Sequence, residues 1–303
     1  LLRPRHIEIQ VLGDEHGTVL PFVERECSIQ RRHQKVIEET PSMVVTPALR
    51  QAIAGAAAAV TRRAGYTNAG TVEFLLDENG EFFFLEVNTR LQVEHPVTEM
   101  VTGLDLVQWQ IRIAQGEKLT LDPARLLTPN GHAIECRVYA EDPENKFMPA
   151  PGLIRHLRSP AGPGIRDDSG VAAGFEVPIF YDSLISKVIA WGEDRNQAIA
   201  RMARALSEYS VGGLKTTIPF FQWILHDPDF VAARMDTTLL DRVLAERAGQ
   251  PFQDVSSESE EAAVIAAALH TYMQGHRTPI GGGGPTGATS AWRRAARMDA
   301  LRS

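Results

Sequence analysis

The 303-residue sequence contains little cysteine and no long hydrophobic run. Its two cysteines, Cys27 and Cys136, lie far apart in the chain, and neither has a spacing typical of a metal site. This argues against a zinc site or a disulfide framework and indicates reduced thiols in a cytoplasmic protein. No apolar run reaches the ~18 residues that a membrane helix requires, and no secretory signal is visible, so no membrane partner is expected.

An excess of positive charge and a glycine-rich phosphate-binding loop are also absent. The formal net charge is -7 and the pI about 5.8, so bulk charge gives no reason to expect a nucleic-acid partner. No glycine-rich loop followed by lysine occurs. The chain is 44% hydrophobic and 23% charged, which is enough apolar material for one large domain or two modest ones.

The most informative segment of the chain is residues 84–96. As a strand that continues into a loop, it carries polar side chains at every second position, and alternation sends these to one face. They are two carboxylates, two amides and one guanidinium, from Glu86, Asn88, Arg90, Gln92 and Glu94. Such a face suits a site that holds a metal ion and an anion.

A hairpin brings a second carboxylate to this face. The Asn79-Gly80 pair between the strand-like runs 71–76 and 81–87 is a strong signal for a two-residue turn. The resulting ladder places Glu73 directly opposite Glu86, with Cβ atoms about 4.5–5.5 Å apart. One carboxyl must then be protonated unless a cation, such as a hard divalent ion, lies between the two. The alternative is a solvated pair on an open sheet face.

Two further groups of side chains are candidates for binding an anion. The segment 30–35 concentrates three fixed cations and a histidine, and it suits phosphate or bicarbonate; a solvated basic loop is the alternative. Arg90 can orient an anion and Glu94 can act as a general base, unless the two form only a structural ion pair. His95 is interpreted as a structural residue, in an extended conformation because it precedes Pro96.

The remaining pattern predicts strands and helices in both halves of the chain. Residues 6–12, 18–24 and 132–138 are strand-like, and 145–182 are rich in short β segments. Thr46 and Pro47 are expected to begin a helix that ends near Gly65. Further helices are expected at 104–114, 194–209, 216–225, 237–247 and 260–273.

These segments closely resemble the biotin carboxylase signature within the ATP-grasp superfamily. The resemblance covers about residues 3–248 and rests on the segments 5–10, 27–35, 84–99, 131–137, 140–143, 151–152, 181–187 and 215–217. Other ATP-grasp enzymes, such as carbamoyl phosphate synthetase, share the Glu86-x-Asn88 core but not the continuation through residues 92–96.

The resemblance implies an α+β fold in two parts. The C-terminal lobe of an ATP-grasp fold, an antiparallel sheet with helices, is expected over residues 1–125. A biotin carboxylase C-terminal domain is expected over 126–248. Residues 249–303 are expected to contain a helix, a Gly-rich linker at 281–284 and the start of a downstream region.

The resemblance also implies a reaction, the carboxylation of biotin with ATP and bicarbonate. Glu94 corresponds to the base that deprotonates bicarbonate, Arg90 to the active-site arginine, and Arg137 to the arginine that stabilises the biotin enolate. The expected ligands of Mg²⁺ or Mn²⁺ are Glu73, Glu86 and Asn88. The expected bicarbonate-binding residues are Lys35, Arg90, Gln92 and Val93. The expected residues around ATP are His6, Gln30, His33, Glu73 and Glu86.

The chain departs from the family pattern in two respects. It starts about where the C-terminal lobe of the family starts, without the glycine-rich lid that closes over ATP, so the polypeptide alone is expected to be inactive or nearly so. It also has no biotin attachment sequence, so biotin is expected on a biotin carboxyl carrier domain or protein. The other expected partners are a second copy of the chain and a carboxyltransferase subunit. The C-terminal tail favours an acetyl-CoA or propionyl-CoA carboxylase over a pyruvate carboxylase.

Two other functions stay open at this point. One is a different ATP-grasp carboxylate–amine ligase, in which mutation of Arg137 would not selectively abolish biotin carboxylation. The other is a non-catalytic assembly module, which need not bind magnesium at Glu73 and Glu86.

Overall fold

The computed structural model describes residues 1–247, 249–252 and 257–275. The chain divides into two compact units, residues 1–253 and 254–303. The described part of the second unit is one helix, α9 (Ser257–Gly275). The predicted linker at 281–284 and the basic tail after it lie outside the described residues. Among the described helices, none is long and apolar enough to cross a membrane.

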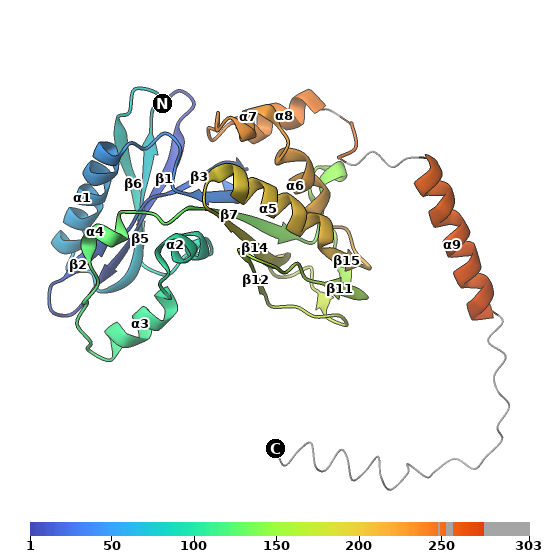
Figure 1. Cartoon of the computed structure of the whole chain (residues 1–303), viewed down its shortest axis with the longest axis horizontal. Coiled ribbons are helices and arrows are strands. Elements are labelled where there is room, and N and C mark those ends of the chain that lie inside the picture. Colours follow the sequence, from blue (N-terminus) through green and yellow to red (C-terminus); the bar gives the residue numbers. More distant parts are fainter. Residues whose placement is uncertain (248, 253–256, 276–303) are drawn as a thin grey trace, which may run out of the picture. The chain divides into compact units, whose positions relative to one another are not determined.

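The first unit is built on one antiparallel sheet (Figure 1). Within the described residues the strands follow the order β12 (Ile165–Ser169), β14 (Leu184–Gly192), β7 (His132–Tyr139), β4 (Gln34–Thr40), β3 (Arg25–Arg31), β1 (Arg5–Gly13), β5 (Asn68–Leu76) and β6 (Phe82–Asn88), with β2 (Val19–Pro21) also paired to β1. Strands from the two halves of the sequence therefore belong to one continuous sheet, as β4 pairs with β7.

Three short antiparallel pairs accompany this sheet. They are β8 (Glu141–Asp142) with β9 (Met148–Pro149), β10 (Gly152–Leu153) with β13 (Glu176–Val177), and β11 (His156–Arg158) with β15 (Ser210–Gly212). They account for the predicted β-rich segment. A short 3₁₀ helix, η1 (Pro143–Asn145), separates β8 from β9.

Helices cover both faces of the sheet. They are α1 (Pro47–Arg63), α2 (His95–Thr102), α3 (Leu106–Ala114), α4 (Pro123–Leu126), α5 (Arg195–Glu208), α6 (Ile218–Ile224), α7 (Pro228–Val231) and α8 (Leu239–Arg247). The alternate residues of β7 divide between two cores. Ile134 and Cys136 pack in the cluster of α5 and α6, whereas Ala133 packs with Val97 and Val101 of α2. The side of β7 that carries Arg137 therefore faces α2.

The prediction for α1 is confirmed at both ends. The Thr46 hydroxyl accepts a hydrogen bond from the Leu49 amide at 3.2 Å, and Pro47 occupies the first position. Gly65 follows the last turn with a φ of 61°. The buried face of α1 consists mainly of small residues, and its Ile53 and Ala57 pack against β1 and β5.

The β5–β6 hairpin has the predicted pairing but not the predicted turn. The loop is one residue longer, since Leu76 pairs with Phe82 and the Asp77 amide donates to the Glu81 carbonyl at 2.9 Å. A bulge then shifts the register between Phe84 and Glu86. The two irregularities cancel, so Glu73 still lies opposite Glu86, as predicted.

The structure differs from the sequence analysis at three further places. The solvated basic loop considered as the alternative for residues 30–35 is instead a hairpin of β3 and β4, whose turn residues Arg32 and His33 have positive φ. The alternation of polar and apolar residues at 6–11 predicts one buried face for β1, but this strand is buried on both faces. His95 is not extended but begins helix α2, so the alternation from Glu86 ends with β6 at Asn88.

Candidate active site

A cavity of about 690 Å³ opens over the end of the sheet formed by β1, β3, β4, β5 and β6. Nine of the twelve predicted site residues line it, namely His6, Gln30, His33, Lys35, Glu73, Glu86, Asn88, Arg90 and Gln92. They come from five strands, the β3–β4 turn and the loop after β6, so only the folded sheet brings them together. The three predicted residues that do not line it are Val93, Glu94 and Arg137.

The buried carboxylate of Glu73 lies at the centre of this group. It accepts hydrogen bonds from His6 Nε2 at 2.8 Å, Gln92 Nε2 at 2.7 Å, Asn88 Nδ2 at 3.0 Å and Lys35 Nζ at 3.0 Å. Burial alone would raise its pKa, but the bond from His6 and the charge of Lys35 lower the pKa of Glu73 to about 2. Glu73 is therefore an ionised acceptor at any physiological pH.

The predicted metal ligands fit a hard divalent cation. Asn88 Nδ2 donates to Glu73 Oε1 and to Glu86 Oε1, each at 3.0 Å, so one neutral amide already bridges the two carboxylates. The orientation of an amide is assigned from its hydrogen bonds, and the opposite orientation presents Oδ1 instead. Two carboxylates and one amide oxygen are donors that Mg²⁺ and Mn²⁺ accept.

A second group of possible ligands is less suited to a cation. Atoms of His6, Glu8 and Glu73 lie within 4.8 Å of one another. However, the Lys35 ammonium contacts both carboxylates, and Arg25 donates to Glu8 at 3.1 Å. The charge of Glu8 is therefore already neutralised by the protein.

Lys35 connects three buried carboxylates. Its ammonium contacts Glu8, donates to Glu73 at 3.0 Å and donates to Glu94 at 2.8 Å. Burial opposes the charge of Lys35, but these carboxylates hold its pKa above the usual value. Lys35 is thus a permanent cation at the boundary between the cavity and the residues beneath it.

Glu94 and Arg137 lie beneath the cavity rather than on its surface. Glu94 is only 2% exposed, and its carboxylate accepts from Lys35 at 2.8 Å and from Arg137 Nη2 at 2.9 Å. Arg137 also donates through Nε to Glu38 at 2.6 Å. The Val93 carbonyl accepts from Lys187 at 2.9 Å. The structure therefore forms an unbroken chain of charges from Lys35 through Glu94 and Arg137 to Glu38.

The other predicted residues differ in how firmly they are held. Arg90 is exposed, and its bonds to the Leu91 carbonyl and to Asn88 Oδ1 are long, at 3.4 and 3.5 Å. His33 is exposed in the β3–β4 turn, whereas Gln30 is fixed by a 2.8 Å bond to the Cys27 carbonyl. The guanidinium of Arg90 is thus available to an anion that enters the cavity.

Sequence reasoning missed several residues of the site. Glu8 could have been found, because polar side chains at every second position of a buried strand indicate a polar interior. Arg25 is fully buried and donates to Glu8, Gln10, Thr71, Thr98 and Gln92, a network that the sequence alone does not reveal. Thr237, Thr238 and Asp241 reach the cavity from the start of α8, far away in sequence.

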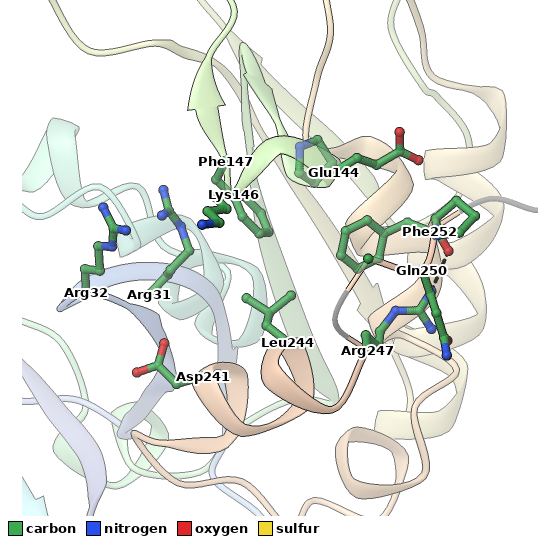
Figure 2. A pocket seen from close by; sticks show the side chains of 13 residues that line it. Arg31, Arg32, Glu144, Lys146, Phe147, Asp241, Leu244, Arg247, Gln250 and Phe252 are labelled. Atoms are coloured by element: carbon green, nitrogen blue, oxygen red, sulfur yellow. Dashed lines mark hydrogen bonds between the residues drawn. The ribbon is translucent and has the colours of Figure 1, made fainter.

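A second cavity, of about 560 Å³, adjoins the first and shares Arg32 and Asp241 with it. Figure 2 shows Arg31, Arg32 and Lys146 on one side and Arg247 with Phe252 on the other. Two of these guanidinium groups already pack on rings, Arg31 on Phe147 at 4.6 Å and Arg247 on Phe252 at 5.1 Å. None of the predicted site residues lines this second cavity.

Comparison with known proteins first identifies the class. Residues 1–122 match the family described as the ATP-binding domain of the carbamoyl-phosphate synthase L chain. This match agrees with an ATP-grasp-type fold. The observed architecture, helices packed on an antiparallel sheet, agrees with the same fold. Residues 135–242 match the biotin carboxylase C-terminal domain. The chain therefore belongs to the biotin carboxylase family. The predicted boundary near residue 125 lies between the two matched ranges but stays a prediction.

Individual relatives agree with this assignment. The chain is 52% identical over 241 residues to a biotin carboxylase of Nostoc, with 80% of this chain and 54% of the relative covered. It is 50% identical over 290 residues to a pyruvate carboxylase subunit of Methanothermobacter thermautotrophicus, with 91% of this chain and 59% of the relative covered. The chain thus spans a little over half the length of these relatives.

A solved structure supports the same family. It is the biotin carboxylase domain dimer of the 2-oxoglutarate carboxylase of Hydrogenobacter thermophilus, in complex with MgADP, ADP and bicarbonate. Sequence identity is 44% and the TM-score 0.80, with 84% of this chain and 55% of that chain covered.

Proposed function

We propose that this chain carries the bicarbonate- and metal-binding part of a biotin carboxylase that uses ATP to carboxylate biotin. The observation that carries the proposal is the juxtaposition of two groups. One is a pair of carboxylates, Glu73 and Glu86, which one amide bridges. The other is the Lys35–Glu94–Arg137 chain beneath the same cavity.

In this proposal, Glu73, Glu86 and Asn88 hold Mg²⁺ or Mn²⁺. When bound, the ion would neutralise charge on the phosphates of ATP. His6, Gln30 and His33 line the same cavity and would contact the nucleotide. Glu73 would thus serve both the metal and the nucleotide.

The cationic wall of the cavity would bind bicarbonate. Lys35, the loosely held Arg90, the Gln92 amide and the backbone at Val93 would orient it, and Glu94 would accept its proton. A bicarbonate oxygen would then attack the γ-phosphorus of ATP, and ADP would leave. The carboxyphosphate formed would break down to carbon dioxide and phosphate, and this phosphate would take the proton from N1 of biotin. The resulting biotin enolate, stabilised by Arg137, would attack carbon dioxide through N1.

The surroundings of Glu94 support its role as a base. Lys35 and Arg137 each donate to its carboxylate, which is almost fully buried, so two cations lie next to the proposed proton acceptor. Bicarbonate entering from the cavity would meet the Lys35 ammonium before it meets Glu94. The same cation can therefore attract the anion and lie next to the base.

The wider context of the reaction is also a proposal. Biotin would arrive on a carrier domain or protein, a carboxyltransferase subunit would use the product, and two copies of the chain would form a dimer. Relatives differ in their acceptor, since one is a pyruvate carboxylase and another a 2-oxoglutarate carboxylase. An acetyl-CoA or propionyl-CoA acceptor and a cytoplasmic location remain predictions from the sequence.

We propose further that residues 1–303 alone use ATP weakly, because no glycine-rich phosphate loop occurs in this sequence. The test supplies the N-terminal half of a relative such as the Nostoc biotin carboxylase and measures phosphate release with ATP, bicarbonate and free biotin. Biotin-stimulated release is expected only when both pieces are present. Full activity of this chain alone would contradict this part of the proposal.

An Arg137→Ala variant separates the candidate functions in the same assay. Loss of biotin-stimulated release with retained binding of Mn²⁺–ADP is the result expected for a biotin carboxylase. Turnover that is insensitive to biotin in both proteins indicates another ATP-grasp ligase. Absence of both turnover and Mn²⁺ binding indicates an assembly module.

A further inference from the structure

Two fully buried glutamates lie next to the proposed biotin-side arginine, and the mechanism above does not use them. Glu38 on β4 and Glu135 on β7 are each 0% exposed and are directly paired across the two strands. Residues opposite each other in an antiparallel ladder have Cβ atoms about 4.5–5.5 Å apart. The two carboxyl groups are therefore near neighbours in the interior.

The hydrogen bonds around this pair are incomplete. Glu38 Oε1 accepts from Arg137 Nε at 2.6 Å, but Glu38 Oε2 has no partner within the described part of the chain. Neither carboxyl oxygen of Glu135 has one either. Three unpartnered oxygens on two adjacent buried acids are incompatible with two negative charges, because an unpaired buried charge is very costly.

The nearby charged groups do not remove this conflict. The cations are Arg137 on β7, Lys35 on β4 and Lys187 on β14. Arg137 is shared between Glu38 and Glu94, Lys35 contacts Glu8, Glu73 and Glu94, and Lys187 donates to the Val93 carbonyl. Glu94, directly before α2, adds a negative charge. On α2, His95 and Glu99 interact with each other and lie near Arg166.

We propose that the Glu38–Glu135 pair retains one proton, that this proton resides on Glu135, and that ionised Glu38 positions Arg137. Glu38 keeps the negative charge because it alone accepts from the guanidinium. Glu135 is then a neutral acid that can donate to the free oxygen of Glu38. This fixes Glu38 as a single, oriented acceptor for Arg137. The positioning part rests on the proposed function, whereas the location of the proton does not.

The electrostatic surroundings agree with this assignment. Burial, together with the charge of Glu38, holds the pKa of Glu135 well above its usual value. Burial also raises the pKa of Glu38, to about 7, but the hydrogen bond and the charge of Arg137 oppose this rise. Glu135 accepts no hydrogen bond from a cation within the described residues, so of the two acids it is the one that holds the proton.

The first experiment locates the proton by infrared spectroscopy of the intact chain at neutral pH. The spectrum of wild type minus that of Glu135→Gln should contain the carbonyl band of a protonated carboxyl group, shifted in D₂O. Glu208→Gln is the matched control, since Glu208 is exposed and paired with Arg204 at 2.9 Å. That difference should contain only bands of ionised carboxylate. A Glu135→Gln difference with ionised-carboxylate bands alone would overturn the proposal.

A second measurement needs no variant and guards against misfolding of Glu135→Gln. Wild-type chain labelled with carbon-13 at the glutamate carboxyl is titrated by NMR. Ordinary glutamates ionise near pH ~4.3. One carboxyl resonance should keep the chemical shift of a protonated acid at pH values well above this. Titration of every glutamate resonance at or below that value would also refute the assignment.

The positioning role is tested in the two-piece assay through its pH profile. Glu38→Gln should lower biotin-stimulated phosphate release by at least roughly tenfold with little change in KM for ATP, because a charge-assisted bond to Arg137 is lost. Glu135→Gln should retain biotin-stimulated phosphate release. In the wild type this release should decline at high pH, because Glu135 ionises, and the decline should be absent in Glu135→Gln. Identical profiles for wild type and both variants would refute the positioning role. A wild type without biotin-dependent turnover would instead refute the proposed function and leave the infrared result unaffected.

Discussion

Lys35 is the residue on which the electrostatics of the site depend most. Its ammonium contacts three carboxylates that are almost fully buried, those of Glu8, Glu73 and Glu94. Removing one partner of a buried ion pair leaves an uncompensated charge, which is far more costly than losing a surface pair.

Lys35→Met should therefore lower the free energy of unfolding by about 3 kcal/mol, measured by urea denaturation. Lys118→Met provides the matched control, because Lys118 is exposed, and it should change stability by less than about 0.5 kcal/mol. Equal effects of the two substitutions would show that Lys35 is not a structural cation.

The low pKa of Glu73 makes the free energy of unfolding depend on pH in the acid range. Its pKa is lowered from 4.5 to about 2, so folding favours the ionised form. The resulting stabilisation is fully present above the unfolded value of 4.5, and it is lost as pH falls from there towards 2.

The wild-type chain should thus lose about 2–3 kcal/mol of unfolding free energy from this group over that range. Glu73→Gln should be less stable at neutral pH and should show a shallower acid dependence, followed by urea denaturation at a series of pH values. Parallel curves for the two proteins would contradict the pKa assigned to Glu73.

At the scale of single residues, sequence reasoning found the polar groups but not their partners. The alternation at residues 86–94 identified the right side chains, although β6 ends at Asn88 and only the loop and α2 bring Gln92 and Glu94 to the same region. Arg25 and Glu38 could not be predicted, because their importance arises from contacts with strands remote in sequence.

At the scale of elements, the β5–β6 hairpin shows how a correct pairing can follow from a wrong turn. The Asn79-Gly80 signal correctly marked a hairpin, but the loop is longer and Gly80 adopts a φ of 81°. The bulge near Leu85 restores the register. A bulge cannot be read from this sequence, since Phe83, Phe84 and Leu85 look alike as strand residues.

Two glycine substitutions test this local conformation. Gly80→Ala should destabilise the chain by about 1 kcal/mol, since a Cβ at that positive φ is strained although no atom lies within 4 Å. Gly55→Ala is the matched control, in an equally open position on α1, and it should stabilise by up to about 1 kcal/mol. Thermal unfolding measures both, and shifts of the same sign would contradict the assigned backbone.

The β3–β4 hairpin was missed for a similar reason. Arg32 and His33 occupy two positive-φ turn positions that usually carry glycine or asparagine, so the sequence gives no turn signal. The turn presents both side chains to the cavity, at a conformational cost that glycine would avoid.

At the scale of the whole molecule, the two matched family regions contribute to one sheet and one charge chain. Lys35, Glu73 and Glu94 lie within residues 1–122, whereas Arg137 lies within 135–242. The pairing of β4 with β7 brings the two sets together. The proposed chemistry therefore needs both regions, and neither region alone would form the site.

The most direct test of the proposed chemistry follows the oxygen atoms of bicarbonate. In the two-piece assay, ATP and biotin are supplied with bicarbonate labelled with oxygen-18, and the released phosphate is analysed by mass spectrometry. Attack of bicarbonate on the γ-phosphorus predicts one labelled oxygen in each phosphate, and Glu94→Gln should greatly reduce this labelled product. Phosphate that carries oxygen from water alone would contradict the proposal, because it would show that the site hydrolyses ATP without activating bicarbonate.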